Sequence, residues 1–206
     1  MNQLPIETGT RYLCRRADQE DIDWSRYPEV LLSDTVTGSA PRQRTAVQAC
    51  WAPGWLFVRF VCEDDHIVST MTQRDDPLYL EDVVEVFVDP EGAGLRYAEF
   101  EFSPRNVQFD AWITNDGEGR IDVDVSWDAD GLRSSVMRDS ENRLVYELAL
   151  PLGGWAPSIR PGEGWRVNLY RIDYSPDGTR ELQAWSPTGK PNFHLPCAFG
   201  QFEFAD

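Results

Sequence analysis

Residues 80–90, Leu-Glu-Asp-Val-Val-Glu-Val-Phe-Val-Asp-Pro, constrain the fold more than any other segment, because they alternate as a β-strand does. Successive side chains of a strand point to opposite faces of the sheet. Three valines share one face, which is wholly apolar and needs a core to cover it: Val84, Val86 and Val88. The other face carries Glu85 between Val83 and Phe87. An acid between two apolar neighbours is not an ordinary solvated surface.

Residues 96–103 repeat this arrangement. Their alternating faces hold Ala98, Phe100 and Phe102 on one side, and Tyr97, Glu99 and Glu101 on the other. Both segments therefore predict strands with an apolar back and an acidic, aromatic front. That front is the candidate ligand face.

Short strand-like segments follow one another along the chain, with turn residues such as Pro, Gly and Asn between them. They span residues 45–51, 55–62, 83–89, 96–102, 107–113, 132–138, 144–150, 165–174, 182–185 and 201–204. No stretch shows a convincing 3.6-residue apolar period of the kind a helix needs. The pattern predicts an all-β fold, an antiparallel β-sandwich of two packed sheets. With 206 residues and no linker or repeat, one domain is expected over residues 1–206.

The chain is strongly acidic, with 35 Asp and Glu against 19 Lys and Arg, and a net charge of −16. Such a field repels a phosphate backbone, so no nucleic acid partner is expected, whereas neutral ligands and divalent cations are compatible. No run of about 18 apolar residues is present, so no membrane span is expected. Residues 1–7 lack the basic and apolar regions of a signal peptide. We expect a cytoplasmic protein if the chain starts at its native residue, and a secreted one if it has been trimmed.

Four cysteines show no CxxC spacing: Cys14, Cys50, Cys62 and Cys197. This argues against structural zinc and against a thioredoxin-type site. Cys50 and Cys62 lie in adjoining strand segments and could meet. We expect free thiols that pack as small apolar side chains.

Several motifs occur in a fixed order along the chain. They are residues 45–47, Trp51, 55–58, 60–65, 81–90, 97–101 and 146–151, then Trp165, Asn168 and Arg171, and finally pieces between residues 185 and 200. In these motifs the chain resembles the family 9 carbohydrate-binding modules, a branch of the wider DOMON-like β-sandwich group. The resemblance implies two antiparallel sheets in a jelly-roll or immunoglobulin-like arrangement. It also implies non-catalytic binding of a mono- or oligosaccharide between two aromatic rings.

Carried over by position, the resemblance places carbohydrate contacts at six residues: Tyr79, Glu85, Tyr170, Arg171, Lys190 and Phe193. Tyr79 and Phe193 take the places of the two rings, where the family usually has Trp, and Glu85 takes that of a hydroxyl-accepting carboxylate. Aromatic rings pack against the faces of a sugar, while carboxylates, amides and cations bind its edges. Ala98 stands where the family has an arginine, which implies a different sugar or a different ligand.

Family members also hold calcium in loops, mostly for structure. This chain has three acidic segments that could supply oxygen ligands: residues 63–65, 75–76 and 173–177. Hard cations take several oxygens, although none of these segments has EF-hand spacing. Structural calcium is therefore the one cofactor considered, with simple solvated acidic loops as the alternative, and its ligands stay unassigned.

Three alternatives remain open at this stage. A hydrolase needs two carboxyl groups on opposite sides of one bond, and Glu85, Glu99 and Glu101 supply the composition alone, so no enzyme is expected. Some DOMON-like domains bind haem, but this chain has His66 and His194 without a CxxCH motif. A structural sandwich that binds an unidentified protein partner is the third alternative.

Arg171 has a second interpretation of its own. It shares a strand face with Val167 and Leu169, and a buried arginine demands a partner. An ion pair with an acid such as Glu85 or Glu147 therefore competes with ligand contact as its role.

Overall fold

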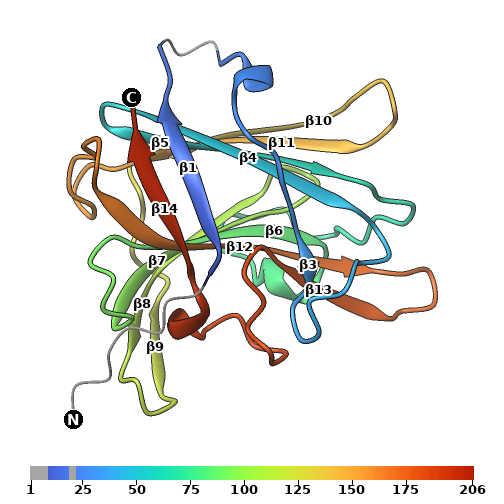
Figure 1. Cartoon of the computed structure of the whole chain (residues 1–206). Coiled ribbons are helices and arrows are strands. Elements are labelled where there is room, and N and C mark those ends of the chain that lie inside the picture. The colour runs from blue at the N-terminus through green and yellow to red at the C-terminus, as the bar shows by residue number, and fades with distance from the viewer. Residues whose placement is uncertain (1–8, 19–21) are drawn as a thin grey trace.

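A computed structural model of the chain describes residues 9–18 and 22–206 (Figure 1). The described residues form fourteen strands: β1 (Arg11–Arg16), β2 (Val30–Leu31), β3 (Ser33–Asp34), β4 (Thr45–Ala52), β5 (Trp55–Cys62), β6 (Val83–Asp89), β7 (Arg96–Phe102), β8 (Gln108–Asn115), β9 (Ile121–Asp124), β10 (Arg133–Arg138), β11 (Leu144–Pro151), β12 (Gly164–Tyr174), β13 (Arg180–Ala184) and β14 (Gly200–Ala205). They also form three short 3₁₀ helices: η1 (Trp24–Arg26), η2 (Leu78–Leu80) and η3 (Pro196–Ala198). None of the helices in this part of the chain is long and apolar enough to cross a membrane. Residues 1–7, on which the signal-peptide expectation rests, lie outside the described residues.

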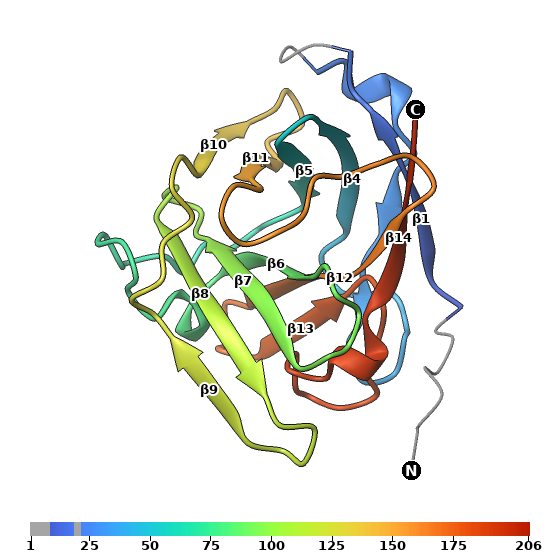
Figure 2. The same cartoon turned by 90° about the vertical axis from the view of Figure 1, so that its left-hand side faces the viewer.

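The strands form two layers that are joined along one side (Figure 2). Hydrogen bonds connect them in the order β10-β11-β5-β4-β1-β14-β12-β6-β7-β8-β9. One layer holds β10, β11, β5 and β4, the other holds β12, β6, β7, β8 and β9, and β1 and β14 close the side between them (Figure 2). Most pairs are antiparallel, but β1 runs parallel to both β14 and β4. The predicted all-β sandwich is confirmed, but the parallel pairing of β1, which lies between β4 and β14, was not predicted from the sequence.

The predicted apolar faces meet between the two layers. Val84, Val86 and Val88 of β6 are buried there, in one cluster with Phe60 of β5 and Tyr146 of β11. Burying one such side chain is worth about 1.5–3 kcal/mol. This core fixes the register of β6, because a slip of one residue would turn its acidic face inward.

The outer face of β6, β7 and β12 carries a second core. Phe193 and Phe199, from the segment between β13 and β14, pack over Phe87, Tyr97 and Tyr170. The predicted acidic and aromatic front therefore has two parts that differ in how they are covered. Its aromatic part is covered by residues 193–199, and its acidic part lies beside that cover.

Strand bounds follow the sequence closely where alternation is strong. β5, β6 and β7 have the predicted bounds, while the bounds of the other predicted strands shift by one or two residues. The structure adds β1, β2, β3 and β9. β2 and β3 are two residues long and β9 ends the strand order, whereas β1 has six residues and lies between β4 and β14. All four cysteines are free thiols, as expected. Cys14, Cys50 and Cys62 are buried, whereas Cys197 is exposed and does not pack as a small apolar side chain.

Candidate functional site

Four neighbouring strands present one row of side chains on the outer face of the second layer. Tyr170 of β12 lies opposite Glu85 of β6, Glu85 lies opposite Glu101 of β7, and Glu101 lies opposite Phe109 of β8. Glu99 precedes Glu101 by two residues and therefore shares its face. The strand register thus brings together three carboxylates that the sequence placed on one front.

These three side chains, Glu85, Glu99 and Glu101, form what we call the carboxylate cluster. One oxygen of each lies within 4.8 Å of the others, and the residues are 2%, 5% and 0% exposed. Among the described residues, Oε1 of Glu85 and both carboxylate oxygens of Glu101 have no hydrogen-bond partner. A buried acceptor left without a donor costs about 1–3 kcal/mol. The cluster is therefore suited to a ligand that brings hydrogen-bond donors.

Burial also changes the protonation of the cluster. Loss of water, followed by the charge of Glu99, raises the pKa of Glu85 well above its usual range. Burial and then the charges of Glu85 and Glu99 do the same to the pKa of Glu101. Burial raises the pKa of Glu99 to about 7. At neutral pH the cluster therefore holds protons that solvated glutamates would have lost.

The carboxylate cluster lines a pocket of about 560 Å³. The remaining lining comes from six segments, among them Tyr79 in η2, Val123 in β9, Arg180 and Leu182 in β13, and Asn192 and Phe193 before η3. This volume lies in the usual range for small-molecule sites. The pocket thus combines apolar and aromatic walls with unsatisfied acid groups.

The structure brings both predicted rings to this pocket, but with unequal exposure. Tyr79 is 46% exposed, and its carbonyl oxygen accepts a hydrogen bond from Nη2 of Arg180 at 2.9 Å. Phe193 is only 8% exposed. Its ring stacks on that of Tyr170, with centroids 4.0 Å apart and planes at 13°. Tyr79 therefore offers an open ring, whereas one face of Phe193 is already occupied.

Two further predicted contacts lie next to the pocket without lining it. Tyr170 is fully buried beneath Phe193. Its hydroxyl donates to the carbonyl oxygen of Phe193 at 3.0 Å and accepts from Nδ2 of Asn168 at 2.7 Å. Lys190 is exposed and directly precedes Pro191, which does line the pocket. Tyr170 thus supports the segment that carries Phe193.

Arg171 points to the opposite face of β12, as strand alternation requires. Its Nη2 donates to Oδ1 of Asp173 at 2.5 Å and to Oδ2 of Asp64 at 3.2 Å, and its Nη1 donates to the carbonyl oxygen of Glu63 at 2.7 Å. The ion pair considered from the sequence is present, but with Asp64 and Asp173 in place of Glu85 or Glu147. These partners differ from the predicted ones because of where Arg171 lies. It follows Val167 and Leu169 on the inner face of β12, at the end where the residues directly after β5 approach that strand.

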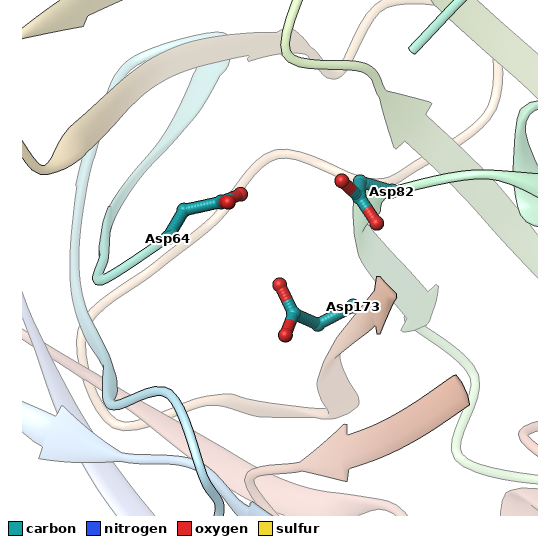
Figure 3. A group of neighbouring side chains, drawn as sticks. All are labelled: Asp64, Asp82 and Asp173. Atoms are coloured by element: carbon teal, nitrogen blue, oxygen red, sulfur yellow. The ribbon is translucent and has the colours of Figure 1, made fainter. Parts of the chain in front are cut away.

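A second acidic group lies around this arginine. The carboxylates of Asp64, Asp82 and Asp173 point toward a common space, with oxygens within 4.8 Å of one another (Figure 3). Burial, followed by the charges of Asp64 and Asp173, raises the pKa of Asp82 to about 6, although backbone amides of Val68 and Tyr174 bond its oxygens. Calcium–oxygen distances of about 2.3–2.6 Å fit such spacing.

Calcium at this group would share two of its three carboxylates with the guanidinium of Arg171. Asp64 and Asp173 belong to segments that the sequence marked as a calcium supply, and Asp82 does not. The donor chemistry and the spacing fit the ion, and calcium binding itself stays a prediction.

The sequence did not single out several lining residues. Glu99 and Glu101 were placed on the front without a binding role, and Arg180 was not considered at all. The Ile-Asp-Val-Asp-Val alternation of residues 121–125 could have revealed β9 and the exposed side chains of Val123 and Val125. His194 also lines the pocket, and its Nδ1 lies 2.9 Å from the hydroxyl of Tyr97. Burial lowers the pKa of His194 to about 4, so it is neutral at physiological pH.

An open two-layer sandwich with an aromatic and acidic pocket on one outer face defines a β-sandwich binding domain. The family model described as carbohydrate family 9 binding domain-like matches residues 18–206. The chain belongs to this family. Membership in the wider DOMON-like group stays a prediction.

Similar proteins support the same fold. An extracellular protein of Arthroderma benhamiae is 26% identical over 184 residues, which is 82% of each chain. A crystal structure from Bacteroides uniformis superposes with a TM-score of 0.75 at 15% identity, covering 94% of this chain and 97% of that one. A carbohydrate-binding module of family 9 from Caldicellulosiruptor kristjanssonii, solved with cellotriose, gives a TM-score of 0.71 at 12% identity. The match covers 95% of this chain and 93% of that one. At these identities the two solved structures show the fold alone.

Proposed function

We propose that the protein binds a saccharide in the pocket above the carboxylate cluster, without catalysing its cleavage. The observation that carries this proposal is the combination of one open aromatic ring, Tyr79, with buried carboxylate oxygens that lack donors. A sugar offers both complements, since its ring face carries C–H groups and its edge carries hydroxyl donors. Membership of the family and the cellotriose complex of its relative support the same ligand class.

In this arrangement the sugar packs against Tyr79 and reaches Phe193 at the far side of the pocket. Glu85 accepts a hydroxyl proton, and Arg180 and Asn192 supply donors at the edge. Arg180 takes the role that the sequence assigned to Lys190 and Arg171, since it lines the pocket and they do not. Lys190 stays a predicted contact for a ligand longer than the pocket.

A binding role also agrees with how the acids are placed. A glycosidase needs two carboxyl groups that flank one bond from opposite sides. Here Glu85, Glu99 and Glu101 occupy neighbouring positions on two strands, with oxygens within 4.8 Å of one another. The cluster faces a ligand from one side and is thus arranged to hold it.

Calorimetric titration with cellotriose, glucose and a panel of other mono- and oligosaccharides tests the proposal. We expect saturable binding that Tyr79→Ala weakens by at least about tenfold, which corresponds to about 1.4 kcal/mol. Leu80→Ala is the matched control, because Leu80 is the adjacent residue, is 54% exposed and is not among the lining residues. Binding that survives Tyr79→Ala unchanged would place the sugar elsewhere, and no binding to any saccharide would refute the function.

A further inference from the structure

The carboxylate cluster forms no ion pair among the described residues, although the charge of Arg180 acts on Glu85 from a greater distance. Ion pairs of the described residues engage other buried acids, such as Asp173 with Arg171 and Asp110 with Arg74, and none reaches the cluster. Among the described lining residues, Arg180 is the one permanent cation. Its Nη2 donates to the carbonyl oxygen of Tyr79. The ligand is thus left to supply hydrogen-bond donors and positive charge to the acid groups at the floor of the pocket.

This arrangement is unfavourable for the empty protein. Glu85 and Glu101 lie directly opposite each other on paired strands, and like charges in that relationship are destabilising. Both are almost fully buried, and three of their four oxygens lack a hydrogen-bond partner among the described residues. A site for neutral hydroxyls alone would be served by a single carboxylate beside amide side chains. Three carboxyl groups that burial keeps partly protonated can ionise together only beside a positive charge, so they favour a ligand that carries one.

The spacing of the cluster fits one particular cation. A primary ammonium group has three N–H donors arranged as a tripod. Acceptors at about 2.8 Å along those three directions lie about 4.6 Å from one another. One carboxylate oxygen from each of Glu85, Glu99 and Glu101 lies no more than 4.8 Å from the other two, so the cluster can offer one acceptor to each donor.

A divalent cation fits the position less well. Calcium takes six to eight oxygens, usually from mobile loops that supply backbone carbonyls. The three glutamates lie within β6 and β7, and each of these strands is hydrogen-bonded to a neighbour on both sides. Their backbone carbonyls are therefore engaged in the sheet and do not complete a coordination shell.

We propose that the natural ligand is an amino sugar, a hexosamine unit or its oligomer, whose protonated amino group binds between Glu85, Glu99 and Glu101. The proposal rests on the proposed saccharide function and adds the chemical class of the sugar. Tyr79 then packs against the ring of the same unit. An N-acetylated sugar has no charge and only one donor on that nitrogen, so the site discriminates against it.

The test compares six probes by calorimetric titration at neutral pH: D-glucosamine, N-acetyl-D-glucosamine, D-glucose, cellotriose, calcium chloride and Nα-acetyl-lysine amide. We expect wild-type protein to bind glucosamine at least about tenfold more tightly than either neutral sugar. Glu101→Gln is expected to abolish this preference, since it keeps the size of the side chain but replaces a carboxyl group that can ionise beside the ammonium with an amide that cannot. Glu118→Gln, which removes an exposed acid outside the pocket, is the matched control.

Each other outcome has a definite meaning. Equal or tighter binding of glucose or N-acetylglucosamine by the wild-type protein overturns the amino-sugar assignment and leaves saccharide binding standing. No binding of any sugar, cellotriose included, overturns both proposals. Calcium binding that Glu101→Gln abolishes would assign the cluster to a metal instead. Tighter binding of Nα-acetyl-lysine amide than of glucosamine would assign the ammonium to a peptide. If Glu101→Gln does not fold, Glu99→Gln repeats the comparison.

Discussion

Glu85 and Glu101 lie directly opposite each other on the paired strands β6 and β7, with both side chains buried on the same outer face. Strand pairing forces them together, because the register of β6 is fixed by the valines on its other face. With Glu99 they make a buried acidic floor beside an exposed tyrosine. The proposed ligand class and the expected pH dependence of stability both depend on that floor.

The first prediction concerns stability against pH. The folded protein raises the pKa of Glu85, Glu99 and Glu101, that of Glu99 to about 7, whereas an unfolded glutamate titrates near pH 4.3. Between about pH 4.5 and about pH 7 the folded state binds more protons, so the cluster's contribution to the free energy of unfolding falls as pH rises. We expect that fall to be on the order of 3 kcal/mol from Glu99 alone, with Glu85 and Glu101 adding to it.

Urea denaturation of wild type and Glu101→Gln across this range measures the effect. Because other acids titrate too, the informative quantity is the difference between the two proteins. Glu101→Gln is expected to gain stability relative to wild type as pH rises, and Glu118→Gln is not. A difference that stays constant with pH would mean that the cluster is not protonated in the folded protein.

The second prediction concerns Arg171. Its guanidinium is buried against Asp64 and Asp173, and removing one partner of a buried pair costs about 3–5 kcal/mol. Arg171→Met should therefore lower the free energy of unfolding by about that amount, measured by urea denaturation. Arg120→Met, at an exposed position, is the control. Since Arg171 faces away from the pocket, sugar affinity of the folded variant should be unchanged, and a selective loss of affinity would contradict its structural role.

The third prediction concerns calcium. Asp64, Asp82 and Asp173 hold more negative charge than the guanidiniums of Arg171 and Arg42 balance, and burial with that charge raises the pKa of Asp82 to about 6. Millimolar calcium should therefore raise the melting temperature above that in a chelator, and Asp82→Asn should remove the effect. Magnesium is the control, because it demands a stricter octahedral shell. An identical melting temperature with calcium and with chelator would show that the arginines satisfy the group alone.

The fourth prediction concerns the thiols. Cys14, Cys50 and Cys62 are fully buried, and burial raises the pKa of Cys50 to about 12 and that of Cys62 to about 11. The thiolate is the reactive form, so these three should be inert to a thiol reagent in the native protein. Cys197 is exposed and should react quickly, giving one reactive thiol per chain that Cys197→Ser removes. More than one fast thiol under native conditions would contradict the packing of the three strands.

The sequence was informative where side-chain alternation decides structure. The two faces of β6 and β7 could be predicted because each strand carries a continuous apolar row, and so the acids were placed on one front. Which acid lies opposite Glu85 could not be predicted, since it depends on the length and shape of the turn between the strands. Only the register shows that it is Glu101.

Contacts between segments that are distant in the sequence were harder to predict. Phe193 was expected to be an open ring, yet it is stacked on Tyr170, because the segment that carries it covers the second core. Arg180 lies in a hairpin whose approach to Tyr79 has no local signal in the sequence. The partners of Arg171 come from the end of β5 and from its own strand, a meeting that only the packing of the two layers determines.

The most direct test of saccharide binding is an NMR measurement of contacts between the bound sugar and the aromatic rings. Cellotriose and glucosamine are titrated into isotope-labelled protein, and nuclear Overhauser effects from sugar ring protons are recorded. The account predicts contacts to the ring of Tyr79, together with shift changes at Glu85, Glu99 and Glu101. Contacts confined to another surface, or no shift changes at saturating sugar, would contradict it.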